Sequence, residues 1–256
     1  MPLEIVTIPC RSDNYAYLLR DTATGRVGLV DAPEAEPIRM ELARRGWGLY
    51  LILITHHHDD HIAGVDALRG EFGAAVVGAA ADRARLPALD KAVADGDRVA
   101  LGESAGTVFE VPGHTIGHVA YHFPASHALF SADSLMVMGC GRLFEGTAEQ
   151  MWRSLARLAA LPPETLVYSG HEYAESNLRF ALSVDGENPA LRARAEEIAA
   201  LRARGEATVP ARLDLEIATN PFLRARDPGM KARMGLAGAP DAVVFAEIRR
   251  RKDAFR

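Results

Sequence analysis

The run Thr-His-His-His-Asp-Asp-His at residues 55–61 decides the fold and the chemistry of this chain. It directly follows residues 49–55 (LYLILIT), a largely apolar stretch that is typical of a strand buried on both faces. In an extended chain, side chains two residues apart point the same way. His56 and His58 can therefore face one metal ion, whereas His57 faces away.

Asp60 and His61 close this run at the turn into a predicted helix, where they can face a second metal ion. Apolar residues at helical spacing and a closing glycine indicate that helix; they are Ile62, Val65, Leu68, Phe72 and Gly73. A histidine-rich run can also be a weak and flexible metal-binding tract. Because this run lies between a buried strand and a helix, we expect fixed ligands. Imidazole and carboxylate groups suit zinc, iron or manganese.

Three further ligand-type residues, His114, Asp133 and His171, each follow a predicted strand. Those strands cover residues 107–111, 128–130 and 165–168. Taken alone, a histidine at such a position is as good a candidate for a structural residue as for a ligand. The recurrence of ligand-type residues after successive strands favours one shared metal site.

The composition is that of an ordinary soluble globular protein, with 48% apolar and 25% charged residues. A formal net charge of -5 gives no general attraction to nucleic acid or to an anionic membrane. No stretch approaches the ~18 apolar residues of a membrane span, and the first residues lack the pattern of a secretory signal. The only cysteines, Cys10 and Cys140, predict two free thiols and a cytoplasmic protein.

The pattern of elements changes along the chain. Short predicted strands with a few helices fill the first two-thirds, and three helical segments follow with little strand signal. Helix-start signals are present at Thr147, Asn188 and Asp241. The patterns predict a four-layer αβ/βα sandwich in residues 1–172, followed by a small α-helical domain in residues 173–256.

The ligand-type residues resemble the pattern of the metallo-β-lactamase superfamily, in which H-x-H-x-D-H is followed by His, Asp and His at longer spacing. The resemblance implies that one metal ion is held by His56, His58 and His114. It implies a second ion held by Asp60, His61 and His171, with Asp133 bridging the two. No ligand role is implied for His57, His118, His122 or His127.

The identity of the bridging residue narrows the resemblance. The β-lactamases of this fold commonly carry a cysteine where this chain has Asp133, and they usually lack a histidine ligand at the position of His61. The resemblance therefore argues against antibiotic hydrolysis.

A more specific resemblance, to the glyoxalase II (hydroxyacylglutathione hydrolase) family, covers essentially the whole chain. The matching segments are GCGRLFEGTA at residues 139–148, LPP at 161–163, GHEY at 170–173, TNPFLR at 219–224 and RRRKDAF at 249–255. Such long matches are more specific than the metal motif, which many hydrolases share.

The family resemblance implies a glutathione site beside the metal ions. Glutathione carries two carboxylates, and Arg249 and Lys252 lie three residues apart on one face of a predicted helix. By spacing alone, this basic helix end is as readily explained by solvation and by the helix dipole. The resemblance implies that Arg249, Lys252 and Arg142 bind the glycine carboxylate, with Tyr173 in the same cleft. Phe144 stands where many relatives carry a tyrosine, so a phenolic hydrogen bond would be missing.

The implied reaction is hydrolysis of S-D-lactoylglutathione and related S-2-hydroxyacylglutathiones to glutathione and a 2-hydroxy acid such as D-lactate, the second step of methylglyoxal detoxification. We expect a hydroxide that bridges two divalent metal ions, zinc before iron or manganese, to attack the thioester. Asp133 would bridge the ions and Asp60 would orient the hydroxide. We expect a monomer that binds a small-molecule substrate, with no nucleic acid or membrane partner.

Three alternatives remain open at the level of sequence. A glutathione persulfide dioxygenase shares the fold and the histidine run, but uses one iron and lacks the helical tail. An RNA-processing nuclease of the superfamily would need an extended basic surface. A glutathione or metal binder without enzymatic activity is the third alternative.

Overall fold

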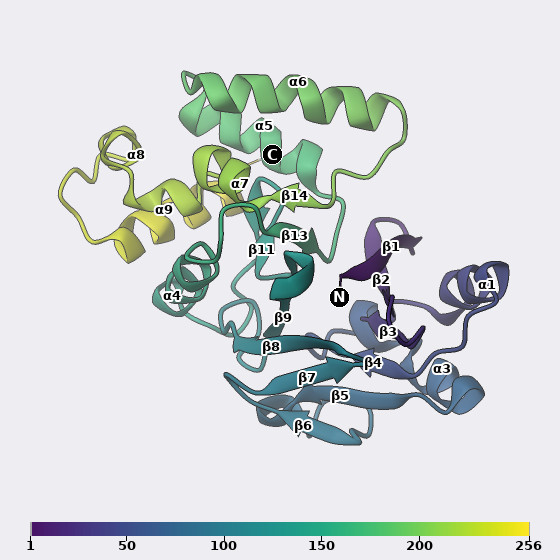
Figure 1. Cartoon of the computed structure of the whole chain (residues 1–256). Helices are drawn as coiled ribbons and strands as arrows, with labels where there is room; N and C mark the ends of the chain where they lie inside the picture. Colours follow the sequence, from purple (N-terminus) through teal and green to yellow (C-terminus); the bar gives the residue numbers. More distant parts are fainter. Residues whose placement is uncertain (1, 256) are drawn as a thin grey trace. The chain divides into compact units, whose positions relative to one another are not determined.

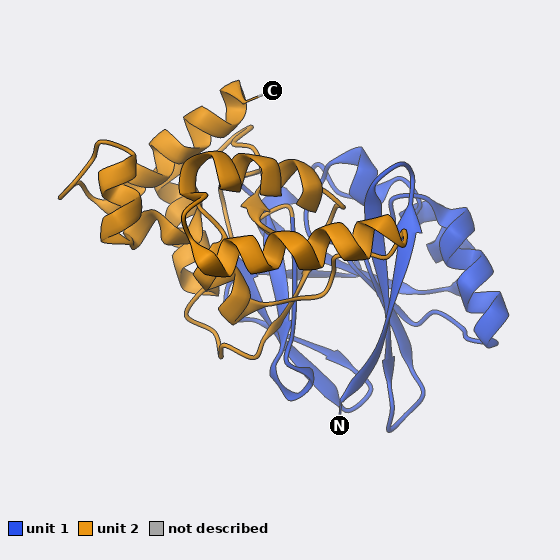
Figure 2. Ribbon diagram, turned by 90° about the horizontal axis from the view of Figure 1, so that it is seen from above, with its two compact units in different colours: residues 1–110, 116–132 blue, residues 111–115, 133–256 orange. Residues whose placement is uncertain are grey.

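A computed structural model describes residues 2–255 of the chain. By their contacts, these residues divide into two compact units (Figure 2). Unit 1 comprises Met1–Glu110 and Ile116–Ala132, and unit 2 comprises Val111–Thr115 and Asp133–Arg256. Among residues 2–255, no helix combines the length and the apolar character that a membrane span requires.

Unit 1 begins with a six-stranded mixed sheet, whose strand order follows the sequence (Figure 1). Its strands are β1 (Leu3–Cys10), β2 (Asn14–Asp21), β3 (Val27–Val30), β4 (Leu51–Leu53), β5 (Ala75–Ala79) and β6 (Lys91–Val93). The first three strands pair antiparallel, and β3 to β6 pair parallel. The long connections between the parallel strands allow helices to cross over one face of the sheet.

Two helices cover this sheet, α1 (Ala35–Arg45) and α3 (Val65–Phe72). Their fully buried side chains pack into one apolar cluster with the strands: Ile38 and Leu42 from α1, Val65 and Leu68 from α3, and Leu29, Ile52 and Val76 from the sheet. The short helix α2 (Asp59–Ile62) precedes α3. Gly64 lies between the two helices, and a larger residue would not fit there, because a Cβ atom would lie 2.8 Å from the backbone of Glu34 and Ala35.

Unit 1 also contains four antiparallel strands in the order β10, β9, β8, β7. They are β7 (Arg98–Leu101), β8 (Ser104–Glu110), β9 (Val119–Phe123) and β10 (Ala128–Ala132); the short helices η1 (Ala80–Asp82) and η2 (Pro124–Ser126) complete the unit. These strands pack on the uncovered face of the first sheet. The rings of Tyr17 and Phe130 lie 5.5 Å apart across the two layers.

A buried carboxylate ties the two layers of strands together. Asp21, at the end of β2, accepts hydrogen bonds from Thr24 and, in the β7–β8 turn, from the Glu103 amide and the Ser104 hydroxyl. These bonds, led by the one from the Thr24 hydroxyl, hold the pKa of Asp21 well below its usual range. Gly102 in the same turn has a φ of 61°, and a Cβ atom there would collide with Asp21 and Thr24.

Unit 2 is mainly helical. Its helices are α4 (Ala148–Leu158), α5 (Ala174–Asp185), α6 (Pro189–Ala203), α7 (Leu213–Thr219), η3 (Leu223–Arg226), α8 (Pro228–Arg233) and α9 (Asp241–Ala254). Its strands are the hairpin β11 (Leu135–Met136) and β12 (Gly139–Cys140), and the antiparallel pair β13 (Leu166–Ser169) and β14 (Ala211–Arg212). Phe180, Phe222 and Phe245 are almost fully buried and form the aromatic centre of the helices.

Several local expectations are confirmed. Thr147 and Gln150 form the predicted capping box of α4, and Asn188 caps α6 with Pro189 in its first turn. Cys10 and Cys140 are free and buried. The prediction that Asp241 caps the last helix was wrong by one residue: Pro240 is the cap, and the Asp241 carboxylate pairs with Lys231 at 2.7 Å.

We predict that Asp21→Ala lowers the free energy of unfolding by about 3 kcal/mol, because four hydrogen bonds to a buried, charged acceptor are lost. Thermal or denaturant unfolding measures this effect. Asp66→Ala, at an exposed position in the first turn of α3, is the control and should cost less than about 1 kcal/mol. Equal small losses in both variants would show that Asp21 does not hold the strand layers together.

Candidate active site

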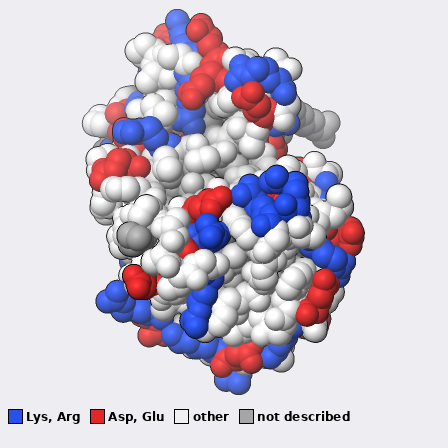
Figure 3. Space-filling model, turned by 45° about the vertical axis from the view of Figure 1, so that its right-hand side comes forward, with Lys and Arg blue, Asp and Glu red and all other residues white. Residues whose placement is uncertain are grey.

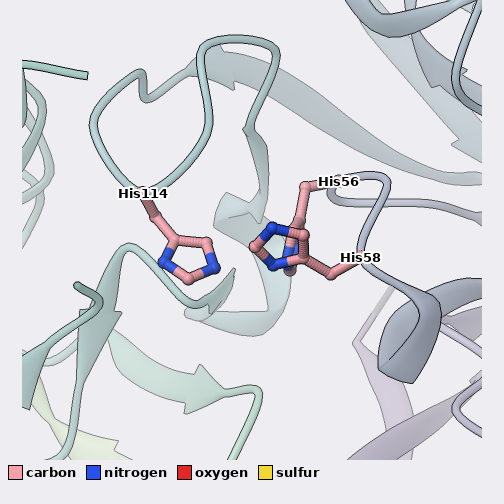
Figure 4. Close-up of side chains that lie close together, drawn as sticks. All are labelled: His56, His58 and His114. Carbon is pink, nitrogen blue, oxygen red and sulfur yellow. The ribbon is translucent and has the colours of Figure 1, made fainter. Parts of the chain in front are cut away.

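The first two predicted ligands, His56 and His58, lie in the loop that follows β4. His56 is fully buried, and its Nε2 atom lies 3.2 Å from Nδ1 of His58 (Figure 4, which also draws His114). Two nitrogens bound to one tetrahedral zinc ion at 2.0–2.1 Å are about 3.3 Å apart. The spacing of these two nitrogens therefore fits a pair of ligands to one ion.

A buried aspartate orients the next histidine. The Nδ1 atom of His61 lies 2.8 Å from Oδ2 of Asp31, which also accepts a hydrogen bond from the Thr55 hydroxyl. The Nε2 atom of His61 lies 3.9 Å from Oδ2 of Asp60. A carboxylate on one ring nitrogen is the usual partner of a histidine whose other nitrogen binds a metal. Asp31 was not predicted as a site residue, although its place at the end of a strand was a visible signal.

Other polar residues of unit 1 hold this loop in place. Asn14 donates a hydrogen bond to the Asp60 carbonyl at 2.9 Å, and the ring of His57 contacts the buried Asp82 at 2.9 Å. The ring of His118 stacks on that of His56, with centroids 4.7 Å apart. The contacts of His57 and His118 are those of residues that shape the loop.

The remaining three predicted ligands come together in unit 2. Oδ2 of Asp133 lies 3.4 Å from Nε2 of His114 and 3.4 Å from Nε2 of His171. All three side chains are buried. Nδ1 of His114 lies 2.9 Å from the Arg142 carbonyl oxygen, which leaves Nε2 to face the carboxylate. One carboxylate between two imidazoles fits a ligand that is shared by neighbouring ions.

The donor set as a whole is that of a metal centre. All seven predicted ligands occur among the His and Asp groups of residues 2–255 that could hold a metal ion. The set contains imidazole and carboxylate donors without thiolate, which suits zinc, iron and manganese.

Two exposed aromatic rings frame the ligands of unit 2. Phe144, which is 63% exposed, contacts the ring of His114 at a centroid distance of 5.2 Å. Tyr173, which is 39% exposed, stacks on the ring of His171 at 4.7 Å. Large aromatic surfaces beside buried ligands are available to contact a bound substrate.

Arg249 is buried in unit 2. Its Nη1 atom donates a hydrogen bond to the Cys140 carbonyl at 3.2 Å, and its Nη2 atom pairs with Asp253 at 2.6 Å. The guanidinium also lies over the ring of Phe222, 5.1 Å from the centroid. Arg249, a predicted substrate cation, thus donates one hydrogen bond to strand β12, and a second nitrogen of its guanidinium group is paired with Asp253.

Lys252, one turn further along α9, has a pKa lowered from 10.5 to about 8. The largest cause is burial, followed by the positive charges of Arg249, Arg179 and Arg142, whereas Asp253 acts in the opposite direction. The Lys252 ammonium group donates a hydrogen bond to the Ser176 carbonyl at 3.0 Å. The predicted cations therefore form a cluster, to which the structure adds Arg179 of α5.

Cys140 is a poor nucleophile in this setting. Burial raises the pKa of its thiol to about 11, although Arg249 acts against that shift. At neutral pH such a cysteine is almost entirely protonated. The geometry therefore favours metal-assisted chemistry over a covalent cysteine mechanism.

Comparison with protein families divides the chain into two matches. Residues 12–171 match the metallo-beta-lactamase superfamily, and residues 172–255 match the family described as "Hydroxyacylglutathione hydrolase C-terminus". These matches confirm the predicted fold class, a metallo-β-lactamase fold followed by a helical C-terminal region.

Curated relatives match over the full length. Proteins named hydroxyacylglutathione hydrolase from Cereibacter sphaeroides and Ruegeria pomeroyi are each 60% identical over 255 residues, covering 100% of both chains. The protein of that name from Methylococcus capsulatus is 53% identical over 254 residues, covering 99% of each chain.

Solved structures show the same fold. The BLEG-1 B3 metallo-beta-lactamase superposes with a TM-score of 0.67 at 23% identity, covering 86% of this chain and 99% of that one. ETHE1 from Myxococcus xanthus superposes with a TM-score of 0.64 at 26% identity, covering 100% of both. TTHA1623 in a di-iron-bound form gives 0.62 at 26% identity, covering 86% of this chain and 100% of that one. The identity over the full length and the match of the helical region together show that the chain belongs to the hydroxyacylglutathione hydrolase (glyoxalase II) family.

Proposed function

We propose that this protein hydrolyses the thioester of S-D-lactoylglutathione, and of related S-2-hydroxyacylglutathiones, to glutathione and the 2-hydroxy acid. Family membership supports this reaction. The structural observation that supports this reaction best is that predicted metal ligands and predicted substrate residues are in direct contact in unit 2. The Arg142 carbonyl fixes the ring of His114, and Phe144 and Tyr173 lie on the rings of two ligands.

We propose that two divalent metal ions, zinc in the first instance, are bound by the predicted set. One would be held by His56, His58 and His114, the other by Asp60, His61 and His171, with Asp133 shared. Bound there, divalent ions lower the pKa of water from 15.7 toward about 7 and polarise a carbonyl group. The di-iron form of a related structure supports a pair of ions, and iron or manganese would also suit these donors.

The protein's own residues would hold and orient the reactants. Asp133 would fix the separation of the ligand groups, and Asp60 would accept a hydrogen bond from the attacking water. The cluster of Arg142, Arg249 and Lys252 would bind the glycine carboxylate of the substrate. The leaving group is a thiolate, which needs little assistance from a general acid.

The two aromatic residues would line the substrate cleft in different ways. The hydroxyl group of Tyr173 can hydrogen-bond to the peptide part of glutathione, whereas Phe144 offers only an apolar face. We therefore expect Phe144 to contribute to glutathione binding through apolar contacts and not through a hydrogen bond.

We further propose that residues 1–172 act as the catalytic domain and residues 173–256 as the glutathione-binding domain. The positions of Arg249 and Lys252 on α9 support this division of labour. Two buried free thiols support a reducing compartment, the cytoplasm. We propose a monomer that acts on a small molecule, without nucleic acid or membrane partners. On the face drawn in Figure 3, acidic and basic side chains are interspersed, so that this face does not offer the extended basic surface that nucleic acid needs.

The decisive assay is loss of the thioester absorbance of S-D-lactoylglutathione on metal-analysed protein. We expect turnover that requires two ions per chain and consumes no oxygen. The alternative, a glutathione persulfide dioxygenase, is less supported, because the helical region matches the hydrolase family. One iron per chain with oxygen consumption, and an intact lactoyl thioester, would favour that alternative.

We predict that Asp133→Ala loses bound metal and lowers kcat more than about 100-fold, since a shared ligand should matter at least as much as the residues that orient ligands. Elemental analysis and steady-state kinetics measure both effects. Asp227→Ala, which removes the cap of α8 and an ion pair with Arg224 in the same unit, is the control and should keep its metal. Two bound ions and a normal rate in Asp133→Ala would refute the bridging role.

Lys252→Ala should raise KM about tenfold or more while changing kcat less than about threefold. The ammonium group would hold a remote part of the substrate equally in the ground state and the transition state, and a charge-assisted hydrogen bond is worth about 1.5–3 kcal/mol. Lys231→Ala is the control, because that lysine pairs with Asp241 at 2.7 Å. If KM stayed the same in Lys252→Ala, this residue would not belong to the substrate site.

The pH dependence of KM should report the same residue. Because the pKa of Lys252 is lowered to about 8, its charge is lost as pH rises through that value, well below the range of an ordinary lysine. KM should therefore increase by up to about tenfold between pH 7.5 and 9.5. Lys252→Arg keeps its charge and should show a flatter profile over this range. Identical profiles for the two proteins would contradict the expectation.

A further inference from the structure

We propose that Asn220, with Glu216, is a positioning residue that sets the geometry of both the metal ligand Asp133 and the substrate residue Arg142. The side chains of Asn220 and Glu216, which we call the clamp, hold the β11–β12 hairpin. The first strand of this hairpin follows Asp133, and its second strand precedes Arg142. This inference rests on the proposed function, and it gives the TNPFLR segment at residues 219–224 a role in catalysis.

The hairpin joins the two functional residues by a short path. Leu135 pairs with Cys140 and Met136 with Gly139, and the Gly141 amide donates to the Ser134 carbonyl at 3.2 Å at the base of the hairpin. A hairpin with two residues in each strand is not stable by itself in water. Its conformation therefore depends on side chains from elsewhere in unit 2.

Asn220 supplies the central contact. It is fully buried, and its Nδ2 atom donates hydrogen bonds to the Gly139 carbonyl at 2.9 Å and to the Met136 carbonyl at 3.2 Å. These two carbonyls belong to residues that pair across the hairpin, so one amide group spans both strands. The Oδ1 atom of Asn220 accepts a hydrogen bond from the Phe222 amide at 3.1 Å.

Glu216, one turn earlier on α7, holds the tip of the hairpin. Its Oε2 atom accepts hydrogen bonds from the Met138 amide at 2.9 Å and from Nδ2 of Asn220 at 3.0 Å. Its Oε1 atom pairs with the buried Arg194 at 3.1 Å. Burial raises the pKa of Glu216, although Arg194 and these hydrogen bonds act against that shift. A buried charge with several good partners is costly to disturb, which makes this clamp rigid.

The same segment also supports the substrate cations. Phe222, two residues after Asn220, lies under the guanidinium of Arg249, and Arg249 donates a hydrogen bond to the carbonyl of Cys140 in β12. Residues 219–224 thus contact the hairpin directly and the cation that flanks it.

The clamp makes a prediction that a purely structural role does not share. If the hairpin shifts, Asp133 at one end and Arg142 at the other shift with it. Because the Arg142 carbonyl also orients the ring of His114, two metal ligands are affected at once. Loss of the clamp should therefore lower metal affinity and kcat together with substrate affinity, whereas loss of a substrate cation affects mainly KM.

Asn220→Asp tests the clamp with a side chain of the same shape. The variant replaces the donating amide by a carboxylate that faces two carbonyl oxygens and Glu216. We expect the affinity for the more weakly bound zinc ion, measured by competition with a chelator, to fall at least tenfold. We expect kcat for lactoylglutathione to fall at least tenfold as well, and KM to rise.

Asn188→Ala is the matched control. Asn188 also lies in the helical part of unit 2, where it caps α6 and donates hydrogen bonds to the Ala218 carbonyl at 3.0 Å and to the Asp185 carboxylate at 2.9 Å. This variant should lower Tm but leave zinc affinity and kcat within about twofold of the wild type. The proposal is overturned if Asn220→Asp, at an equal loss of Tm, binds zinc and turns over like the control.

A milder variant decides the matter if Asn220→Asp does not fold. Asn177 on α5 donates a hydrogen bond to the Val137 carbonyl at the hairpin tip, at 3.0 Å. Asn177→Leu should lower zinc affinity and kcat in the same direction, by about threefold or more; unchanged values would overturn the proposal. Zinc affinity is measured without substrate, and wild-type hydrolysis is tested separately, so failure of the clamp is distinguishable from failure of the proposed reaction.

Discussion

The orientation of buried imidazoles by hydrogen bonds is the constraint on which the rest of this structure depends. A histidine binds a metal ion well if one ring nitrogen points toward the ion and the other is held by a hydrogen bond to a neighbouring group. Here the Asp31 carboxylate holds His61, and the Arg142 carbonyl holds His114. Such arrangements are costly unless every buried polar group has a partner. The polar residues at the ends of the strands therefore determine how the neighbouring loops must fold.

The groups that orient the histidine rings also connect the predicted metal ligands with the predicted substrate residues. The group that orients His114 belongs to Arg142, a predicted substrate residue, and the hairpin before it begins beside Asp133. The helices have an effect beyond the proposed binding of glutathione, because Asn220 at the end of α7 and Arg249 on α9 both donate hydrogen bonds to carbonyls of the second strand of that hairpin. A substitution in a helix far along the sequence can in this way alter metal binding.

Much of the fold was predictable because its signals are local. The strand before His56, the capping box at Thr147 and the change to helices after residue 173 depend on neighbouring residues. The β1–β2 hairpin was missed, because its apolar residues do not alternate clearly. The seven candidate ligands were visible as residue types at strand ends. Asp31, Arg179 and Asn220 were not recognised as site residues, because their roles come from contacts with residues distant in sequence. Asp31 at a strand end and Asn220 in the TNPFLR segment carried local signals, but those signals did not show what the side chains contact.

The central claim is that five imidazoles and two carboxylates hold two metal ions, with Asp133 shared. The most direct measurement is a crystal structure of the zinc-loaded protein with anomalous scattering recorded at the zinc absorption edge. The account predicts two anomalous peaks, both in contact with the Asp133 carboxylate. A single peak, or peaks bound by other side chains, would contradict it.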